Sequence, residues 1–131
     1  MEPVTPGPRV LVADDDELLR TLVRAMLVNA GMRVTEAADG EIALREFQTG
    51  DEFSLILLDL EMPRLGGLEV LTAVRSGVRR TTVPIIMLTG SDSAEVESLA
   101  LREGADDFIR KPITPAGLLS RVKALLARAA A

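Results

Sequence analysis

The sequence FSLILLDLEMP, residues 53–63, places four consecutive apolar residues directly before a carboxylate. Four residues are too few for an ordinary helix, and an uninterrupted apolar run is typical of a strand buried on both faces. The run ends at Asp59, and the following Met62-Pro63 pair cannot continue the strand. A carboxylate at the rim of a core is costly unless a cation or hydrogen bonds stabilise it. Asp59 is therefore either a simple loop cap or one member of a charged site.

Four further segments predict strands, and their composition predicts where each strand lies in a sheet. The runs at 10–13 and 85–88 are apolar throughout, like 55–58, and belong in the middle of the sheet. The segments 32–38 and 107–111 mix polar and apolar residues, which favours edge positions. Strands that alternate with helices indicate an α/β fold with a parallel sheet. We expect a doubly wound, flavodoxin-like (βα)5 domain with strand order 2-1-3-4-5.

The helices between these strands are predicted from apolar residues at helical spacing and from residues that begin or end helices. Gly31 and Gly104 follow two periodic segments and predict helix ends. Asp39 is placed to cap the start of the second helix. Thr114-Pro115 opens the last helix with a capping residue and a proline at the first helical position.

Composition narrows the classes of function. The chain has 131 residues, a net charge of −5, no Cys and no His, so disulfides, thiolate metal sites and histidine chemistry are excluded. The acidic balance argues against direct binding of nucleic acid, and no segment is apolar enough to span a membrane. The first residues do not resemble a signal peptide, so we expect a cytoplasmic address. We expect a disordered lead-in over 1–8, one domain over 9–128, and a tail or linker start over 129–131.

Polar residues gather where the predicted strands end. In doubly wound sheets the ligand crevice lies at the carboxyl ends of the strands, near the switch between strands 1 and 3. Each of these residues alone has an ordinary structural explanation, such as helix capping or surface exposure. Their joint occurrence at four separate strand ends favours a common site. The five residues are Asp14, Asp15, Asp59, Thr89 and Lys111.

Several segments together resemble the receiver domain of bacterial two-component response regulators. The resemblance covers about residues 9 to 128, and two mild departures are Ala13, where a larger apolar residue is common, and Phe108, where the family often has Tyr. The segments that carry it are Val12-Ala13-Asp14-Asp15-Asp16, Leu57-Leu58-Asp59-Leu60-Glu61-Met62-Pro63, Gly66-Gly67, Met87-Leu88-Thr89-Gly90 and Lys111-Pro112.

The resemblance implies a phosphoacceptor site that requires magnesium. Asp59 would accept a phosphoryl group from a histidine kinase or a phosphotransfer protein. Asp14 and Asp15, Asp59 itself and the backbone carbonyl of Glu61 would hold a Mg²⁺ ion, which takes oxygen ligands and retains waters. Phosphoryl transfer to a carboxylate depends mainly on positioning and charge neutralisation, so the lack of His is no obstacle. The chain would be a signalling switch that catalyses only its own phosphorylation and dephosphorylation.

The resemblance also implies how the phosphoryl group is sensed. Thr89 and Lys111 would contact its oxygens, and Phe108 would fill the space that a moving Thr89 vacates. Glu61 and Ser91 would tune hydrolysis. The face formed by helix 4, strand 5 and helix 5 would then signal to a downstream protein or output domain, or form a phosphorylation-dependent homodimer.

Three other classes of protein fit parts of the sequence. A flavodoxin-type flavin carrier shares the fold, but four acids follow the first strand here and the chain has no Tyr or Trp to stack on a flavin. A magnesium-dependent phosphatase with an aspartyl-phosphate would need a second Asp two residues after the nucleophile, where this chain has Glu61. A pseudo-receiver, acting as a phosphorylation-independent interaction module, stays as the alternative. It would be expected to lose an acid, the Thr or the Lys, and all of them are present.

Overall fold

The computed structural model describes residues 6–50, 52–77 and 81–130, and within them it contains one parallel sheet of five strands. The strand order is β2-β1-β3-β4-β5, as the sequence predicts. Three strands with continuous apolar runs lie in the middle, and the two strands of mixed composition lie at the edges. The strands are β1 (Arg9–Ala13), β2 (Arg33–Ala37), β3 (Leu55–Asp59), β4 (Ile85–Thr89) and β5 (Asp107–Arg110).

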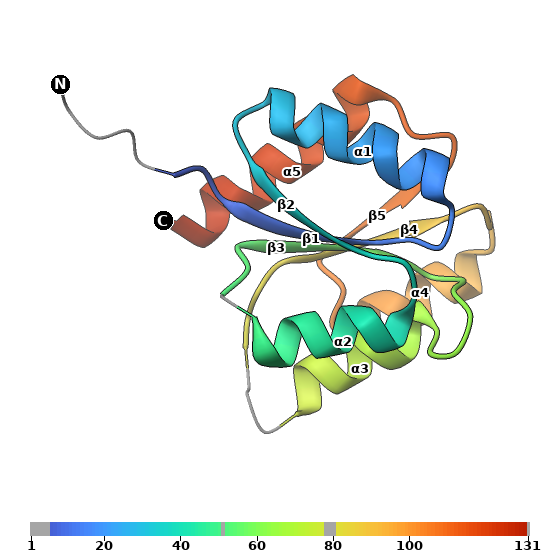
Figure 1. Cartoon of the computed structure of the whole chain (residues 1–131). Coiled ribbons are helices and arrows are strands. Elements are labelled where there is room, and N and C mark those ends of the chain that lie inside the picture. Colours follow the sequence, from blue (N-terminus) through green and yellow to red (C-terminus); the bar gives the residue numbers. More distant parts are fainter. Residues whose placement is uncertain (1–5, 51, 78–80, 131) are drawn as a thin grey trace, which may run out of the picture.

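Helices cover both faces of the sheet (Figure 1). The first and last helices lie on one face, and the three others lie on the opposite face. This arrangement follows from right-handed crossovers that change direction once along the sheet. The helices are α1 (Glu17–Asn29), α2 (Gly40–Thr49), α3 (Gly67–Ser76), α4 (Ala94–Arg102) and α5 (Pro115–Ala130).

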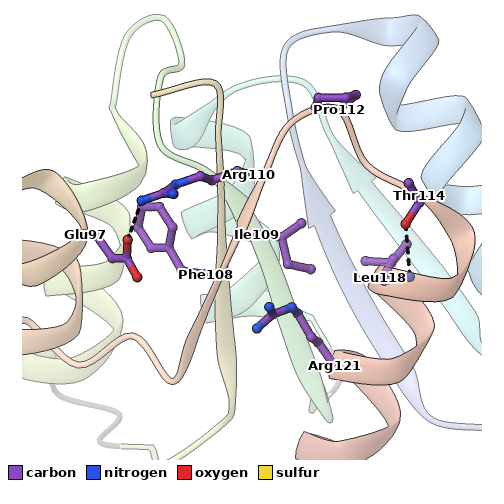
Figure 2. A pocket seen from close by; sticks show the side chains of 9 residues that line it. Glu97, Phe108, Ile109, Arg110, Pro112, Thr114, Leu118 and Arg121 are labelled. Atoms are coloured by element: carbon purple, nitrogen blue, oxygen red, sulfur yellow. Dashed lines mark hydrogen bonds and ion pairs between the residues drawn. The ribbon is translucent and has the colours of Figure 1, made fainter. Parts of the chain in front are cut away.

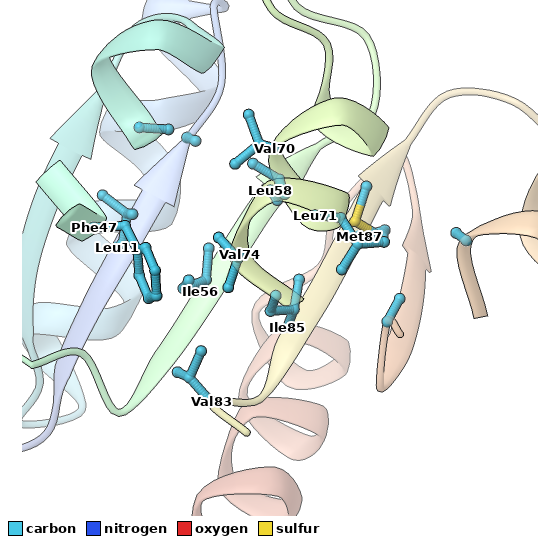
Figure 3. Packing of buried hydrophobic residues seen from close by; sticks show 14 of the residues in the cluster. Leu11, Phe47, Ile56, Leu58, Val70, Leu71, Val74, Val83, Ile85 and Met87 are labelled. Carbon is cyan, nitrogen blue, oxygen red and sulfur yellow. The ribbon is translucent and has the colours of Figure 1, made fainter. Parts of the chain in front are cut away.

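Two hydrophobic cores result, one on each face of the sheet. Side chains alternate along a strand, so Leu11 and Ala13 point into the core beneath α2, α3 and α4 (Figure 3), whereas Val10 and Val12 point toward α1 and α5. All five residues of β3 are buried, including its last residue, Asp59. The strand that carries the candidate acceptor is therefore fixed from both faces.

The predicted helix boundaries are confirmed. Gly31 (φ 91°) and Gly104 (φ 113°) take the left-handed conformation after α1 and α4, which glycine adopts without the steric cost that a side chain imposes. The Asp39 side chain accepts a hydrogen bond from the Ile42 amide at the start of α2. Thr114 caps α5, because its hydroxyl accepts the Gly117 amide and Pro115 is the first helical residue.

The ends of the chain and the edge strands differ slightly from expectation. The predicted strands 32–38 and 107–111 shorten to β2 and β5, since the Met32 amide is still bonded to Leu27 at the end of α1. Of the lead-in expected over 1–8, residues 1–5 lie outside the described residues. The helix α5 continues to Ala130, so part of the segment assigned to a tail is helical. Within the described ranges, every helix is too short or too polar to cross a membrane.

Candidate functional site

Three of the predicted residues meet at the carboxyl edge of the sheet. Asp14 directly follows β1, Asp59 ends β3, and Lys111 directly follows β5. The Lys111 ammonium Nζ lies 3.2 Å from Asp14 Oδ2 and 3.4 Å from Asp59 Oδ1. One cation therefore serves two carboxylates that come from strands on either side of the switch in strand order.

Asp59 is a buried carboxylate with an unfavourable negative charge. The residue is only 3% exposed. Burial, with the neighbouring charge of Asp14, raises the pKa of Asp59 from 3.8 to about 6, although Lys111 and the Glu61 amide act in the opposite direction. The Glu61 amide lies 3.4 Å from Asp59 Oδ1. Asp59 is thus held at the rim with incomplete compensation for its charge.

The ammonium of Lys111 is stabilised by these two acids. Burial alone would lower the pKa of Lys111, but the attraction of Asp59 and Asp14 raises it above its ordinary value. Lys111 therefore remains charged at neutral pH. Its side chain keeps partial access to solvent, with 26% exposure, so the ammonium can shift toward an anion that arrives at the rim.

The carboxylates form a set of oxygens suited to a divalent cation. Carboxylate oxygens of Asp14, Asp15 and Asp59 all lie within 4.8 Å of one another. Asp14 is 1% exposed, and its Oδ2 atom has no hydrogen-bond partner among the described residues. The Lys111 ammonium lies 3.2 Å from that oxygen and forms an ion pair with it. A buried, unsatisfied carboxylate oxygen beside two other acids fits the oxygen ligation that Mg²⁺ requires.

Two of the other predicted residues, Thr89 and Ser91, lie at the carboxyl end of β4. Thr89 ends β4 and is fully buried, and its hydroxyl oxygen accepts the Ser91 amide at 3.0 Å. The Ser91 hydroxyl in turn accepts the Ser93 amide, just before α4 begins. The Thr89 carbonyl accepts the Lys111 amide at 2.7 Å. Thr89 is thereby connected both to the backbone of Lys111 and to the start of α4.

Phe108 lies near the start of β5, on the side of the sheet that faces α4. It is paired in register with Met87, it is 8% exposed, and it packs into the core beneath α4. Phe108 also lines a pocket between α4 and α5, together with Glu97 and Arg110 (Figure 2). The Arg110 guanidinium forms an ion pair with Glu97 at 2.8 Å across the mouth of this pocket. Leu101 on α4 is 46% exposed.

The sequence did not indicate Arg20, which contacts the backbone of the site, or Glu36, which contacts Arg20. Arg20 on α1 donates through Nη1 to the Asp14 carbonyl at 2.8 Å and through Nε to Glu36 of β2 at 3.0 Å. A partial signal exists, because Glu36 is paired in register with Val12 and so faces α1. That register is known only once the strands are aligned.

The five-stranded sheet and the acid cluster at its rim define a receiver domain. A family model described as "Response regulator receiver domain" matches residues 10–123, and the chain belongs to this family. The chain is 40% identical over 120 residues to the "Alkaline phosphatase synthesis transcriptional regulatory protein PhoP" of Bacillus subtilis, which covers 92% of this chain and 49% of that protein. It is 42% identical over 123 residues to the "Transcriptional regulatory protein PrrA" of Mycobacterium tuberculosis, covering 93% and 51%.

A solved structure shares both fold and family. The receiver domain of the Francisella response regulator 1452 superposes with a TM-score of 0.86 at 34% identity, covering 93% of this chain and 98% of that one. The chain spans about half the length of the two curated relatives described above.

Proposed function

We propose that this chain is a phosphorylatable switch in which Asp59 accepts a phosphoryl group in a reaction that requires Mg²⁺. The observation that carries the proposal is the pairing of a buried acceptor carboxylate with an unsatisfied oxygen of Asp14 and a shared ammonium. Such a cluster is unfavourable as it stands. It becomes favourable when a divalent cation and a phosphoryl group are added together.

The proposed transfer needs no acid or base from the protein. An ionised oxygen of Asp59 forms a bond to phosphorus as the bond between phosphorus and an imidazole nitrogen of the donor breaks. The electron pair stays with that nitrogen, which takes up a proton from solvent. Bound Mg²⁺ would supply charge neutralisation, held by Asp14, Asp15, Asp59 and the Glu61 backbone carbonyl.

Lys111 and Thr89 bind the transferred group in this proposal. Lys111 gives up part of its attraction to Asp59 and pairs with a phosphoryl oxygen, since the Asp59 carboxylate loses its own negative charge in the acyl phosphate. The Thr89 hydroxyl oxygen already accepts the Ser91 amide, so its proton is available to donate to the phosphoryl group.

The signal then travels along β4 and β5. A phosphoryl group favours conformers that bring Thr89 closer to Asp59, and Phe108 moves into the space left behind Thr89. Phe108 packs beneath α4 and lines the pocket beside the Arg110–Glu97 ion pair. Its movement would therefore change the surface formed by α4, β5 and α5, including the exposed Leu101.

Partners follow from this reading. We propose a histidine kinase or a phosphotransfer protein as the donor, and a downstream protein, an output domain or a second copy of the chain as the receiver of the signal. The two relatives whose names describe transcriptional regulation support an output of that kind. The domain itself, with its net charge of −5, is not proposed to bind nucleic acid. A cytoplasmic location and a domain that spans residues 9–128 belong to the same proposal.

Intact-mass spectrometry with acetyl phosphate tests the acceptor and the metal requirement together. We expect one added phosphoryl group with MgCl2 and none in excess chelator. Asp59→Asn should stay unmodified, and Asp92→Asn, which removes an exposed acid before α4, should be modified like the parent protein. Modification of Asp59→Asn, or full modification in chelator, would contradict the proposal.

A further inference from the structure

We infer that Arg20 is a positioning residue for the proposed cation site, acting through the backbone of Asp14. This inference rests on the proposed function, because it concerns the same acids. Arg20 is well packed, with a side chain that is 14% exposed, and it donates hydrogen bonds to the Asp14 carbonyl and to the Glu36 carboxylate. The cation is Mg²⁺, as argued above from the oxygen ligands.

The argument begins with the two peptide planes that flank Asp14. The Asp14 amide belongs to the first plane and donates to Ala37 of β2 at 3.1 Å. The Asp14 carbonyl belongs to the second plane and accepts Arg20 Nη1 at 2.8 Å. Because each peptide is planar, holding both planes fixes the two backbone dihedrals of Asp14 and therefore the direction of its side chain.

The remaining freedom of the Asp14 side chain is also restricted. Its Oδ1 atom accepts the Asp16 amide at 2.9 Å, which leaves Oδ2 directed toward Lys111 and the other acids. The plane held by Arg20 also carries the amide of Asp15, so the same contact restrains the second acid of the cluster. Arg20 thus contributes to the placement of both acids without touching either carboxylate.

Arg20 is itself held by a strand. Glu36 of β2 accepts a hydrogen bond from Arg20 Nε at 3.0 Å, while Arg20 Nη1 donates to the Asp14 carbonyl. The guanidinium group therefore links β2 to the segment that carries the acids. A planar guanidinium has several N–H donors in fixed directions and can bond to two acceptors at once. A lysine ammonium is a compact charge and bridges the same two acceptors less well. Arg24 lies 3.6 Å from the same Glu36 carboxylate, and among the contacts that the structure describes for it none reaches Asp14.

The direction of the change in Mg²⁺ affinity after loss of Arg20 distinguishes a positioning role from a purely electrostatic one. A guanidinium near the cation repels it, so removal of the charge alone would strengthen Mg²⁺ binding. Removal of a group that orients the ligands weakens binding, typically by about tenfold for a residue outside the ligand set. Positioning therefore predicts weaker binding after Arg20→Ala, opposite to the electrostatic effect.

The test is a MgCl2 titration of the phosphate-free protein, followed by amide NMR at Asp16, which bonds to the Asp14 carboxylate. We expect the dissociation constant to rise about tenfold for Arg20→Ala. Arg20→Lys should also bind more weakly, by at least about threefold, since it keeps the charge but loses the planar guanidinium. Arg24→Ala, which removes an equal charge from the same carboxylate, should bind Mg²⁺ as well as the parent protein.

Glu36→Ala and Arg20→Lys test the inference if Arg20→Ala does not fold, and both should weaken Mg²⁺ binding. If Arg20→Ala does fold, the Arg20→Ala/Glu36→Ala double variant should bind no more weakly than Arg20→Ala alone, because both changes act through one contact. Unchanged or tighter binding in Arg20→Ala, or an equal loss in Arg24→Ala, would overturn the inference. A parent protein without saturable Mg²⁺ shifts would instead overturn the proposed function.

Discussion

Replacement of Asp59 by Asn should stabilise the metal-free protein. The ordinary carboxyl pKa of 3.8 rises to about 6 in the fold, through burial and the charge of Asp14. The folded state therefore binds the Asp59 proton more tightly than the unfolded state does. As pH rises from about 4 to about 7, the unfolded chain loses this proton first, so stability falls with pH. Above that window the full cost of the buried charge is present.

The size of this cost follows from the same pKa values. A rise from 3.8 to about 6 corresponds to about 3 kcal/mol of folding free energy at neutral pH, at about 1.4 kcal/mol per pKa unit. Asn has nearly the shape of a protonated Asp and carries no charge. We expect Asp59→Asn to raise the free energy of unfolding by about 1–3 kcal/mol at pH 7.5, after relaxation of the real site is allowed for.

Urea unfolding in chelator, followed by far-ultraviolet circular dichroism, measures this difference, since the chain has no Trp or Tyr for fluorescence. The difference in the free energy of unfolding between Asp59→Asn and the parent protein should be close to zero near pH 4 and reach its maximum above pH 7. The exposed control Asp92→Asn should change stability by less than about 0.5 kcal/mol. MgCl2 should narrow the gap by stabilising the parent protein. A gap that does not depend on pH would refute the reasoning.

Three further predictions concern the lifetime of the phosphorylated state, the transmission of the signal through Phe108, and the backbone strain at Arg64. Glu61→Ala and Ser91→Ala should still be phosphorylated with Mg²⁺ but should differ from the parent in the rate of dephosphorylation; unchanged decay in both would count against a role in hydrolysis. Beryllofluoride with Mg²⁺ should shift amide resonances across residues 89–111, and shifts confined to the rim would exclude the relay through Phe108. Arg64→Gly should raise the free energy of unfolding by about 1 kcal/mol in urea, because Arg64 has a φ of 69° and its side chain, 66% exposed, lies 3.6 Å from Asp39 in a weak ion pair; a loss of stability would show that this ion pair outweighs the strain.

The order of the strands in the sheet could be predicted because the composition of each strand reflects how deeply it is buried. A strand with continuous apolar residues can be stable only between two layers of helices, so the three central strands were identifiable without any contact. The residues at the strand ends followed, since parallel strands bring their carboxyl ends to one edge. Asp59 and Lys111 were placed together in this way, and the structure brings them to 3.4 Å.

Contacts between a side chain and the backbone were not predictable in the same way. Arg20 looks like any exposed basic residue on an amphipathic helix, and its role depends on where the Asp14 carbonyl points. The left-handed conformation of Arg64 is likewise absent from the sequence pattern, because glycine or asparagine would be expected at such a position. Both depend on the path of a loop, which composition and periodicity do not encode.

The acidic run after β1 shows how the fold gives different tasks to similar residues. Asp14 is buried and points an unsatisfied oxygen into the site, while Asp15 is exposed and lies within reach of the same cation position. Asp16 turns away and caps α1 by accepting the Leu19 amide, and Glu17 begins that helix, where a negative charge is favourable. Two acids of the run are therefore explained by helix formation alone. Asp14 and Asp15 do not cap the helix. Asp14 is paired with the Lys111 ammonium at 3.2 Å, and the proposed Mg²⁺ would neutralise the negative charge that remains on the two acids.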